Sequence, residues 1–291
     1  VSVIDMGSKS VTAKVDLKAL GFSENAKPHH AVAGPKGKHW YVTLIGENTI
    51  LKFNRKNELV GRVTGFEVPG LLSIHPSSNR LYAGRSMSAV DPPKSLGVIN
   101  RKKMTVSKRI DTFFPRPHPI VVRDDGAYAF IASLATNQLM GIDTKTDETK
   151  LTRLGGETQT LVQFAMTPDG ETLIAGGQKT GQLLIFDAGQ APGLTVEDTV
   201  QVGKQPWHPV ISKGGRLAYV PNKASNTVSV VNLEKGVVTA TIKGEGLAQP
   251  AEVVVDPTVE LQERLPVRAV PLVVFEQEVV HPIGRHEHAE E

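Results

Sequence analysis

The sequence predicts an all-β fold, a β-propeller with four-stranded blades, on three observations. A segment that opens with proline recurs along the chain at spacings of 41, 48, 44, 45 and 44 residues. Each resulting unit holds four short runs rich in β-branched and apolar residues. Apolar residues do not recur at helical spacing, which excludes a helical solenoid. A period of about 40–45 residues with four strands per unit is typical of propeller blades.

Equivalent positions can be followed from unit to unit. The units open at Pro28, Pro69, Pro117, Leu161, Pro206 and Pro250. Nine residues later comes a polar turn with glycine, at Gly37, Gly126, Gly170 and Gly215. Thirteen residues after the opening stands an aromatic or aliphatic strand residue, namely Tyr41, Tyr82, Phe130, Ile174 and Tyr219. The first strand is apolar on both faces, as in 120–122, so we expect it to be the innermost strand, packed between neighbouring blades.

The propeller is predicted to span residues 1–257. Five complete blades are expected at 28–68, 69–115, 116–160, 161–205 and 206–249. Residues 1–20 contain two β-type runs that match the second half of a repeat, so they would supply the outer strands of a closing blade whose inner strand is 250–257. Such closure by the two ends of the chain removes exposed strand edges. The count is six blades, or seven if a further blade lies upstream.

Residues 258–291 depart from the repeat and form an acidic extension. A strand at 268–275 is compatible with the composition, although Pro271 weakens it, and the rest is expected to be a flexible tail. His286 and His288 form a His-x-His pair, which is compatible either with a metal site or with an ordinary tail.

Short sequence motifs resemble the YVTN-type β-propeller repeat. They are Pro28-His29-His30, Tyr41-Val42-Thr43, Thr167-Pro168-Asp169-Gly170 and Asn226-Thr227-Val228-Ser229-Val230-Val231-Asn232. The resemblance covers residues 1–257 and is specific for the fold, much less for activity. It implies a bacterial surface or periplasmic propeller, similar in architecture to the haem-binding propeller of dissimilatory nitrite reductases. We therefore expect an exported protein, periplasmic or extracellular, whose signal peptide is not in this chain.

Charge and composition narrow the classes of partner. The net charge of +3 combines −6 on residues 251–291 with +9 on residues 1–250, a body that favours anionic ligands or partners if it is more than a solvated surface. No apolar run is long enough for a membrane span. Aromatic content of 5% provides little stacking surface, so nucleic-acid binding is not expected. The absence of cysteine excludes disulfides and thiolate metal sites.

Candidate site residues gather on one face of the predicted propeller. The loops that lead into the first strands and the loops between second and third strands lie at the same end of a blade, which we call the mouth face. We expect the ligand-binding residues there to be His29, His30, Arg85, Arg116, His118, Lys179, His208 and Lys223. The four cations would form a funnel for anions, with arginine the better carboxylate or phosphate ligand.

The histidines leave two interpretations open. Neutral imidazole is a common metal ligand, so His29, His118 and His208 could hold copper or haem. Equally, a histidine after the opening proline could bond backbone groups between blades. Because neighbouring residues of a strand face opposite ways, only one of His29 and His30 is expected to point into the channel.

The sequence thus predicts an extracytoplasmic propeller that binds a ligand or a protein, as an accessory subunit of a larger complex, with a protein or a small anion as partner. The alternative is a metal- or haem-dependent redox enzyme that uses the histidine-lined mouth. Enzymatic activity is left undecided, with a binding role favoured, and no residue is assigned a catalytic role.

Overall fold

The computed structural model describes residues 1–5, 8, 10–88 and 90–244. They form a two-stranded hairpin followed by five four-stranded antiparallel sheets, each made of four strands consecutive in sequence. The predicted inner strand at 250–257, the predicted strand at 268–275 and the pair His286 and His288 lie outside the described residues. Within the described part, no helix is long and apolar enough to cross a membrane.

The strands begin close to where the repeat predicts them. The hairpin consists of β1 (Ser2–Asp5) and β2 (Ser10–Lys14). The five blades are β3 (Pro28–Ala33), β4 (His39–Leu44), β5 (Thr49–Asn54) and β6 (Leu59–Val63); β7 (Pro69–Ile74), β8 (Arg80–Arg85), β9 (Ser95–Asn100) and β10 (Thr105–Asp111); β11 (Pro117–Val122), β12 (Tyr128–Ser133), β13 (Gln138–Asp143) and β14 (Thr149–Arg153); β15 (Leu161–Met166), β16 (Thr172–Gly177), β17 (Gln182–Asp187) and β18 (Thr195–Gln201); β19 (Val210–Ile211), β20 (Leu217–Asn222), β21 (Thr227–Asn232) and β22 (Val237–Lys243). Two short 3-10 turns, Pro35–Gly37 and Ile45–Glu47, occur in the first blade.

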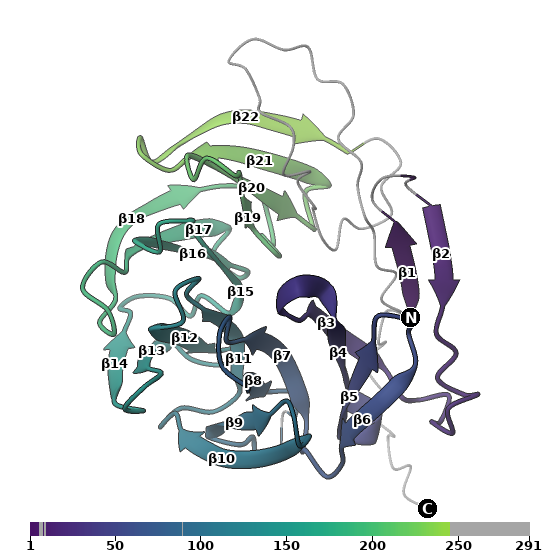
Figure 1. The fold of residues 1–291 in the computed structure, drawn as a ribbon. Helices are drawn as coiled ribbons and strands as arrows, with labels where there is room; N and C mark the ends of the chain where they lie inside the picture. Colours follow the sequence, from purple (N-terminus) through teal and green to yellow (C-terminus); the bar gives the residue numbers. More distant parts are fainter. Residues whose placement is uncertain (6–7, 9, 89, 245–291) are drawn as a thin grey trace, which may run out of the picture.

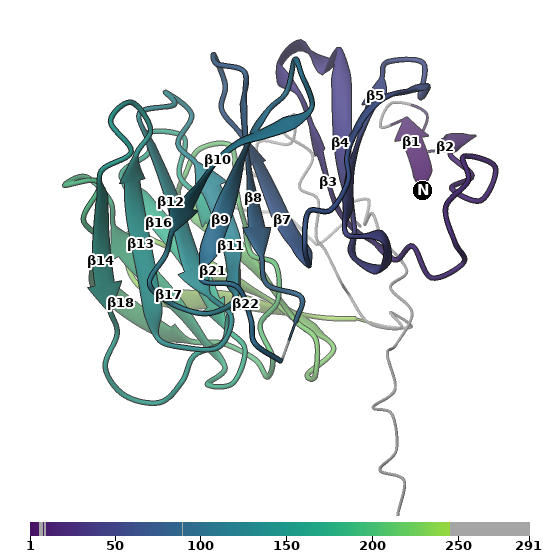
Figure 2. The same ribbon diagram turned by 90° about the horizontal axis from the view of Figure 1, so that it is seen from below.

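The blades are arranged around a common centre (Figure 1). The first strands β3, β7, β11 and β15 lie nearest the centre and contact one another in sequence order, and the fourth strands lie at the rim. Seen from the side, the blades stand next to one another with their strands running between two faces (Figure 2). This is the predicted architecture, an all-β series of propeller blades, and five four-stranded sheets with one hairpin agree with a count of about six.

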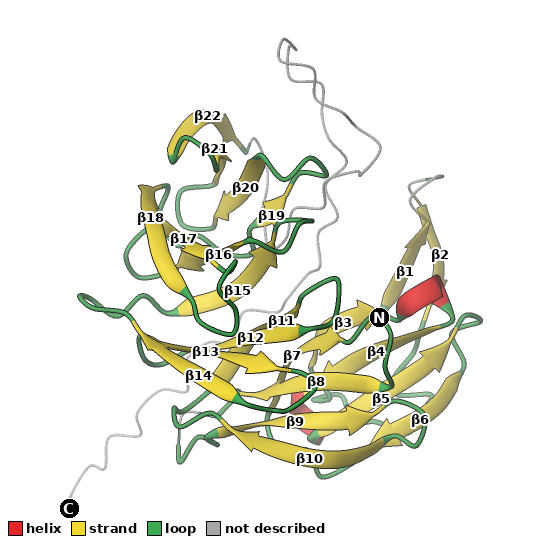
Figure 3. Cartoon of the chain, turned by 60° about the vertical axis from the view of Figure 1, so that its left-hand side comes forward, coloured by secondary structure: helices red, strands yellow, loops and turns green. Residues whose placement is uncertain are grey.

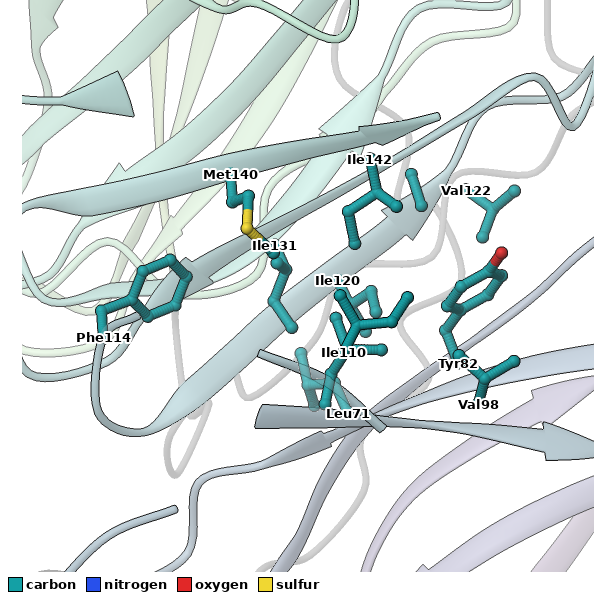
Figure 4. Close-up of a cluster of buried hydrophobic side chains, with 12 residues drawn as sticks. Leu71, Tyr82, Val98, Ile110, Phe114, Ile120, Val122, Ile131, Met140 and Ile142 are labelled. Atoms are coloured by element: carbon teal, nitrogen blue, oxygen red, sulfur yellow. The ribbon is translucent and has the colours of Figure 1, made fainter. Parts of the chain in front are cut away.

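The core consists of layers between adjacent blades. One layer packs Leu71 and Tyr82 of the second blade against Ile120, Ile131 and further residues of the third (Figure 4). The aromatic and aliphatic residues predicted at the thirteenth position fill such layers, since Tyr41, Tyr82, Phe130 and Ile174 are at most 1% exposed. Burying one large aliphatic side chain contributes about 1.5–3 kcal/mol, so the layers supply most of the driving force that holds the blades together.

The hairpin packs onto the first blade. Val1 and Val15 exchange backbone hydrogen bonds of 2.8–2.9 Å, which continue the pairing of β1 with β2. Val15 is buried in a cluster with Leu44 and Phe53 of the first blade. Figure 3 shows the hairpin beside β4 and β5. The N-terminal runs therefore belong to the same folded body as the blades.

The predicted turn glycines have a conformational reason. Gly37, Gly126, Gly170 and Gly215 all have φ between 61° and 79°, the left-handed region that glycine enters without steric cost. Each lies in the tight connection from the first to the second strand of its blade. The turn is therefore part of the repeat because the strands could not reverse there with an ordinary residue at the same low cost.

The first strand of the fifth blade is shorter than its counterparts, with two residues against six in each of the other four. Pro206 forms only an isolated bridge with Asn222, and regular pairing resumes at Val210 with Tyr219. Pro209 has no N–H to donate, so the ladder cannot continue through this segment. The entry segment of this blade, which carries His208, is held at both ends rather than along its length.

Candidate functional site

Every described blade enters its first strand through the same strained backbone. The residue before the strand opening has φ between 47° and 54° in all five blades, and none of these residues is glycine; they are Lys27, Val68, Arg116, Thr160 and Gln205. In each blade the carbonyl of this residue accepts a hydrogen bond from the residue that follows the second strand, as from Ile45 to Lys27 at 3.0 Å and from Leu134 to Arg116 at 2.9 Å. This bond joins the two loop sets of the mouth face and fixes where the next residues begin.

A bulge follows directly in the first strand. Pro28 pairs with Leu44, but the next paired residue is Ala31 with Val42, so the strand carries one extra residue at 29–30. The same irregularity occurs at 70–71, 118–119 and 162–163. A bulge breaks the simple alternation of side chains between the two faces of a strand. The expectation that only one of His29 and His30 reaches the centre therefore rested on an alternation that the strand does not keep.

Four histidines from three blades come together in the entry segments of the first strands. The ring centroids of His29 and His118 lie 5.6 Å apart with the planes tilted by 54°. His29 and His30 both act electrostatically on His118 and on His208, which places all four rings in one group. The structure thus brings together His29, His30, His118 and His208.

Burial keeps these rings neutral. Burial, with a smaller contribution from the neighbouring histidines, lowers the pKa of His30 and of His208 to about 3. The pKa of His118, which is 5% exposed, falls well below its usual value for the same reasons, with Arg116 adding a small contribution. Burial also lowers the pKa of His29, although a hydrogen bond from its ring to the backbone of Gly70 opposes the shift. At neutral pH the group is uncharged.

Two of the four rings have defined structural partners. Nδ1 of His30 accepts a hydrogen bond from the backbone N–H of Leu72 in the next blade at 3.1 Å. Nδ1 of His118 lies 2.6 Å from Oγ of Ser86, which is fully buried. These contacts support, for His30 and His118, the interpretation in which histidines bond groups between blades.

Other polar atoms at the bulges have no partner. Among the described residues, the buried side-chain atoms without a hydrogen bond include Nδ1 of His29, Nδ1 of His208 and Oε1 of Gln163. All three residues are the second or third residue of an entry segment, in the first, fifth and fourth blades. A buried polar atom without a partner costs about 1–3 kcal/mol, which makes these positions candidates for contact with a ligand or with further protein.

The predicted cation funnel is only partly assembled. Arg85 is 6% exposed, pairs with Glu67 and donates a hydrogen bond to Ser95 Oγ at 2.8 Å, so it is directed along its own blade. Arg116 donates from Nε to the carbonyl of Ser86 at 2.9 Å and lies beside His118. Of the four predicted cations, Arg116 is therefore the one that the structure associates with the histidines.

The two lysines lie further along the mouth face. Nζ of Lys223 stands 5.0 Å from the ring centroid of Trp207, which in turn stacks on His208 with a centroid separation of 5.5 Å. Lys179 is exposed in the loop after β16. Lys223 thus reaches the histidine group through Trp207.

The described residues fit a resident metal poorly. No group of three or more His, Asp or Glu side chains within them has the arrangement that would hold a metal ion. The Nδ1 atoms of His30 and His118 are committed to Leu72 and Ser86. We therefore derive no chemical step through copper or haem from these residues.

Gly70 and Ser86 are parts of the site to which the sequence alone assigned no role. Gly70 occupies the bulge position that holds His29 and His118 in the flanking blades, and a Cβ there would clash with Ser86 Oγ and approach His118 Nδ1 to 3.3 Å. The gap in the series of histidines at this position was visible in the sequence. The gap leaves space for two rings from the neighbouring blades, and this could be recognised only once the positions of those blades were known.

Comparisons with known proteins identify the fold. No family model and no curated protein sequence matches the chain. Among solved structures, 1622 chains match. One of them is a chain of hydrazine synthase from Kuenenia stuttgartiensis, with a TM-score of 0.51 and 14% sequence identity over 81% of this chain and 91% of that chain. At this level of identity the likeness concerns the fold alone, a series of four-stranded antiparallel sheets arranged as propeller blades.

Proposed function

We propose that this protein is an extracytoplasmic binding module whose ligand, a small molecule or a protein segment, enters at the mouth face. The observation that carries the proposal is the set of unpartnered buried atoms on the entry segments, His29 Nδ1, Gln163 Oε1 and His208 Nδ1. Two of them belong to the group of neutral imidazoles, which has Arg116 as an adjacent positive charge. A ligand that donates hydrogen bonds and carries a negative group would satisfy both features.

Exposed apolar side chains on the same face support a protein partner. Phe113, 64% exposed, lies in the loop from β10 to β11, and Val90, 84% exposed, lies in the loop from β8 to β9. The two loops are joined by backbone hydrogen bonds from Thr112 to Lys94 and from Arg116 to Pro93. Large apolar groups that project from two loops fixed to each other by hydrogen bonds are suited to packing against another protein. An accessory subunit of a larger assembly would use such a surface.

The export and the family assignment belong to the same proposal. Support comes from the position of the YVTN-like motif, since Tyr41-Val42-Thr43 lies in the second strand of its blade and 226–232 covers β21, where the repeat requires them. Fractionation of cells that express the natural gene tests the location. Recovery from the periplasm or the medium is expected, and recovery from the cytoplasm would contradict the proposal.

The binding role is tested on protein purified without denaturation from its natural host. Native mass spectrometry, followed by cross-linking in cell extract, is expected to reveal a bound molecule or a reproducible partner. The double variant His29→Ala with Gln163→Ala should lose that species. Lys235→Ala, in the exposed β21–β22 turn on the opposite face, should keep it. If the double variant is folded, as its thermal midpoint would show, and still retains the bound species as the wild type does, the mouth face is not the binding site.

A second candidate is the metal- or haem-dependent redox enzyme. Its one supporting observation is that Nδ1 of both His29 and His208 lacks a partner within the described residues. Metal analysis and an optical spectrum of the same native protein separate the two candidates. A stoichiometric metal or a visible haem band that disappears in His29→Ala would favour the redox enzyme, whereas a protein or small-molecule adduct with no metal signal would favour the binding module.

A further inference from the structure

The two junctions that join the second blade to its neighbours are built on the same backbone pattern. In the turn from β13 to β14, Asp147 donates its N–H to the carbonyl of Asp143 at 2.8 Å and has φ 64°. In the turn from β9 to β10, Met104 donates to the carbonyl of Asn100 at 2.8 Å and has φ 51°. Met104 therefore occupies the position that Asp147 has one blade later. Both turns lie on the face opposite the mouth.

The junction of the second and third blades is electrically balanced. Arg80 and Lys108 of the second blade both pair with the carboxylate of Asp147. Arg80 also donates to the carbonyl of Thr144 in the same turn. The junction thus holds two cations against one carboxylate placed between them.

The junction of the first and second blades has the cations without the carboxylate. Lys52 of the first blade donates from Nζ to the carbonyl of Arg101 at 2.8 Å, the position equivalent to Thr144. The Arg101 side chain donates within its own blade, to the carbonyl of Ser78 in the β7–β8 turn. No ion pair within the described residues involves Lys38, Lys52 or Arg101. The apolar Met104 stands where the neutralising carboxylate would be.

The positive charges of this junction disfavour one another. Burial lowers the pKa of Lys52, and Arg101 lowers it further. Burial also lowers the pKa of His39, with Lys52, Arg101 and Lys38 adding to the effect. In addition, Nε of Arg101 is buried and has no hydrogen-bond partner among the described residues. One donor of the guanidinium therefore has no acceptor within the described residues.

We propose that the cationic junction formed by Lys38, His39, Lys52 and Arg101 binds a small oxyanion of the phosphate or sulfate class. The anion supplies the negative charge that Asp147 supplies in the next junction, and an oxyanion accepts hydrogen bonds from lysine and arginine donors. The site is separate from the mouth and independent of the ligand that binds there.

The test follows the unfolding of the full chain by circular dichroism at pH 7 in rising inorganic phosphate, with sodium chloride added to hold the ionic strength constant. Phosphate is expected to raise the thermal midpoint in a saturable manner, because a ligand that binds only the folded state stabilises it by mass action. Lys52→Gln, whose amide can still donate to the Arg101 carbonyl, should weaken phosphate binding at least tenfold. Lys56→Gln, an exposed lysine in the nearby β5–β6 turn, is the matched control and should leave binding unchanged.

Two further variants add a carboxylate to the cationic junction and remove the carboxylate from the balanced junction. Met104→Asp places a carboxylate in the cationic junction and should abolish the phosphate effect. Asp147→Asn removes the carboxylate from the balanced junction and should create a second phosphate-dependent stabilisation. A wild-type midpoint that responds equally to phosphate and to chloride would overturn the proposal, as would equal weakening in Lys52→Gln and Lys56→Gln. If Met104→Asp fails to fold, the Lys52→Gln comparison alone still decides.

Discussion

His29 in the first blade and His118 in the third place their ring centroids 5.6 Å apart, across the point where the second blade has Gly70. Three consecutive inner strands therefore share one small volume, with two rings contributed by the outer pair and no side chain by the middle one. The Ser86 hydroxyl completes the arrangement at 2.6 Å from His118 Nδ1. The stability of the blade interfaces and the geometry of the mouth depend on the same few residues.

Gly70→Ala should destabilise the protein. The added Cβ would clash with Ser86 Oγ and approach His118 Nδ1 to 3.3 Å, so the hydrogen bond between these two groups must break or the strands must move. We expect the free energy of unfolding to fall by about 1–3 kcal/mol in urea denaturation. Gly214→Ala, where no atom lies within 4 Å of the new Cβ, should change it by less than about 0.5 kcal/mol. Equal effects in the two variants would show that the space at Gly70 is not required.

His30→Ala should destabilise through a backbone group rather than a lost charge. The ring is neutral, and its Nδ1 accepts the N–H of Leu72 from the next blade. Without the ring this buried N–H has no partner, at a cost of about 1–3 kcal/mol in the free energy of unfolding. His30→Asn, whose side-chain oxygen can accept the same bond, should recover part of the loss. If alanine and asparagine prove equally destabilising, the hydrogen bond is not what His30 contributes.

Stability should fall in mildly acidic solution. His30 and His208 keep a pKa of about 3 in the folded protein, against about 6.5 in an unfolded chain. Below pH 6.5 the unfolded chain therefore takes up protons that the folded protein does not, and stability present in full above that pH is lost progressively down to about pH 3. From pH 7 to pH 5 the loss is at most about 2 kcal/mol for each histidine, reduced by the partial exposure of both rings.

The measurement is the urea midpoint at a series of pH values, for the wild type and for His208→Gln. Removal of one neutral histidine should make the curve between pH 7 and pH 5 visibly flatter. An unchanged curve would mean that His208 takes up its proton as readily in the folded protein as in the unfolded chain.

Val68→Gly should leave the protein as stable or make it more stable. Val68 is β-branched and has φ 47°, a conformation that costs an ordinary residue about 1–2 kcal/mol and glycine almost nothing. Against this gain stands the greater flexibility of glycine in the unfolded chain, about 0.5–1 kcal/mol. We expect a net change between zero and about 1 kcal/mol in favour of the folded state. Val60→Gly, at an exposed position within β6, should destabilise by about 0.5–1 kcal/mol and provides the reference.

Much of the fold could be predicted because the signals that define each repeat lie close together in the sequence. Each signal, whether an opening proline, a turn glycine or an alternating strand residue, determines the conformation of only a few neighbouring positions. Gly126, with φ 79°, and Tyr82, with no exposed surface, lie where the pattern places them. Topology then followed from the repeat, because four consecutive strands per unit allow one simple order. The meeting of His29, His118 and His208 at one end of the blades followed in the same way.

The chain's local pattern thus determined the blades, their order and the end at which the histidines gather. The tertiary structure alone decided which contacts those residues make. Four features arise only between strands or between blades. They are the bulge at 29–30, the space at Gly70, the pairing of Arg85 with Glu67, and the presence of Met104 where the next blade has the carboxylate of Asp147. Such relationships depend on the register and spacing of segments far apart in the sequence, and a local pattern carries no information about the distance between them.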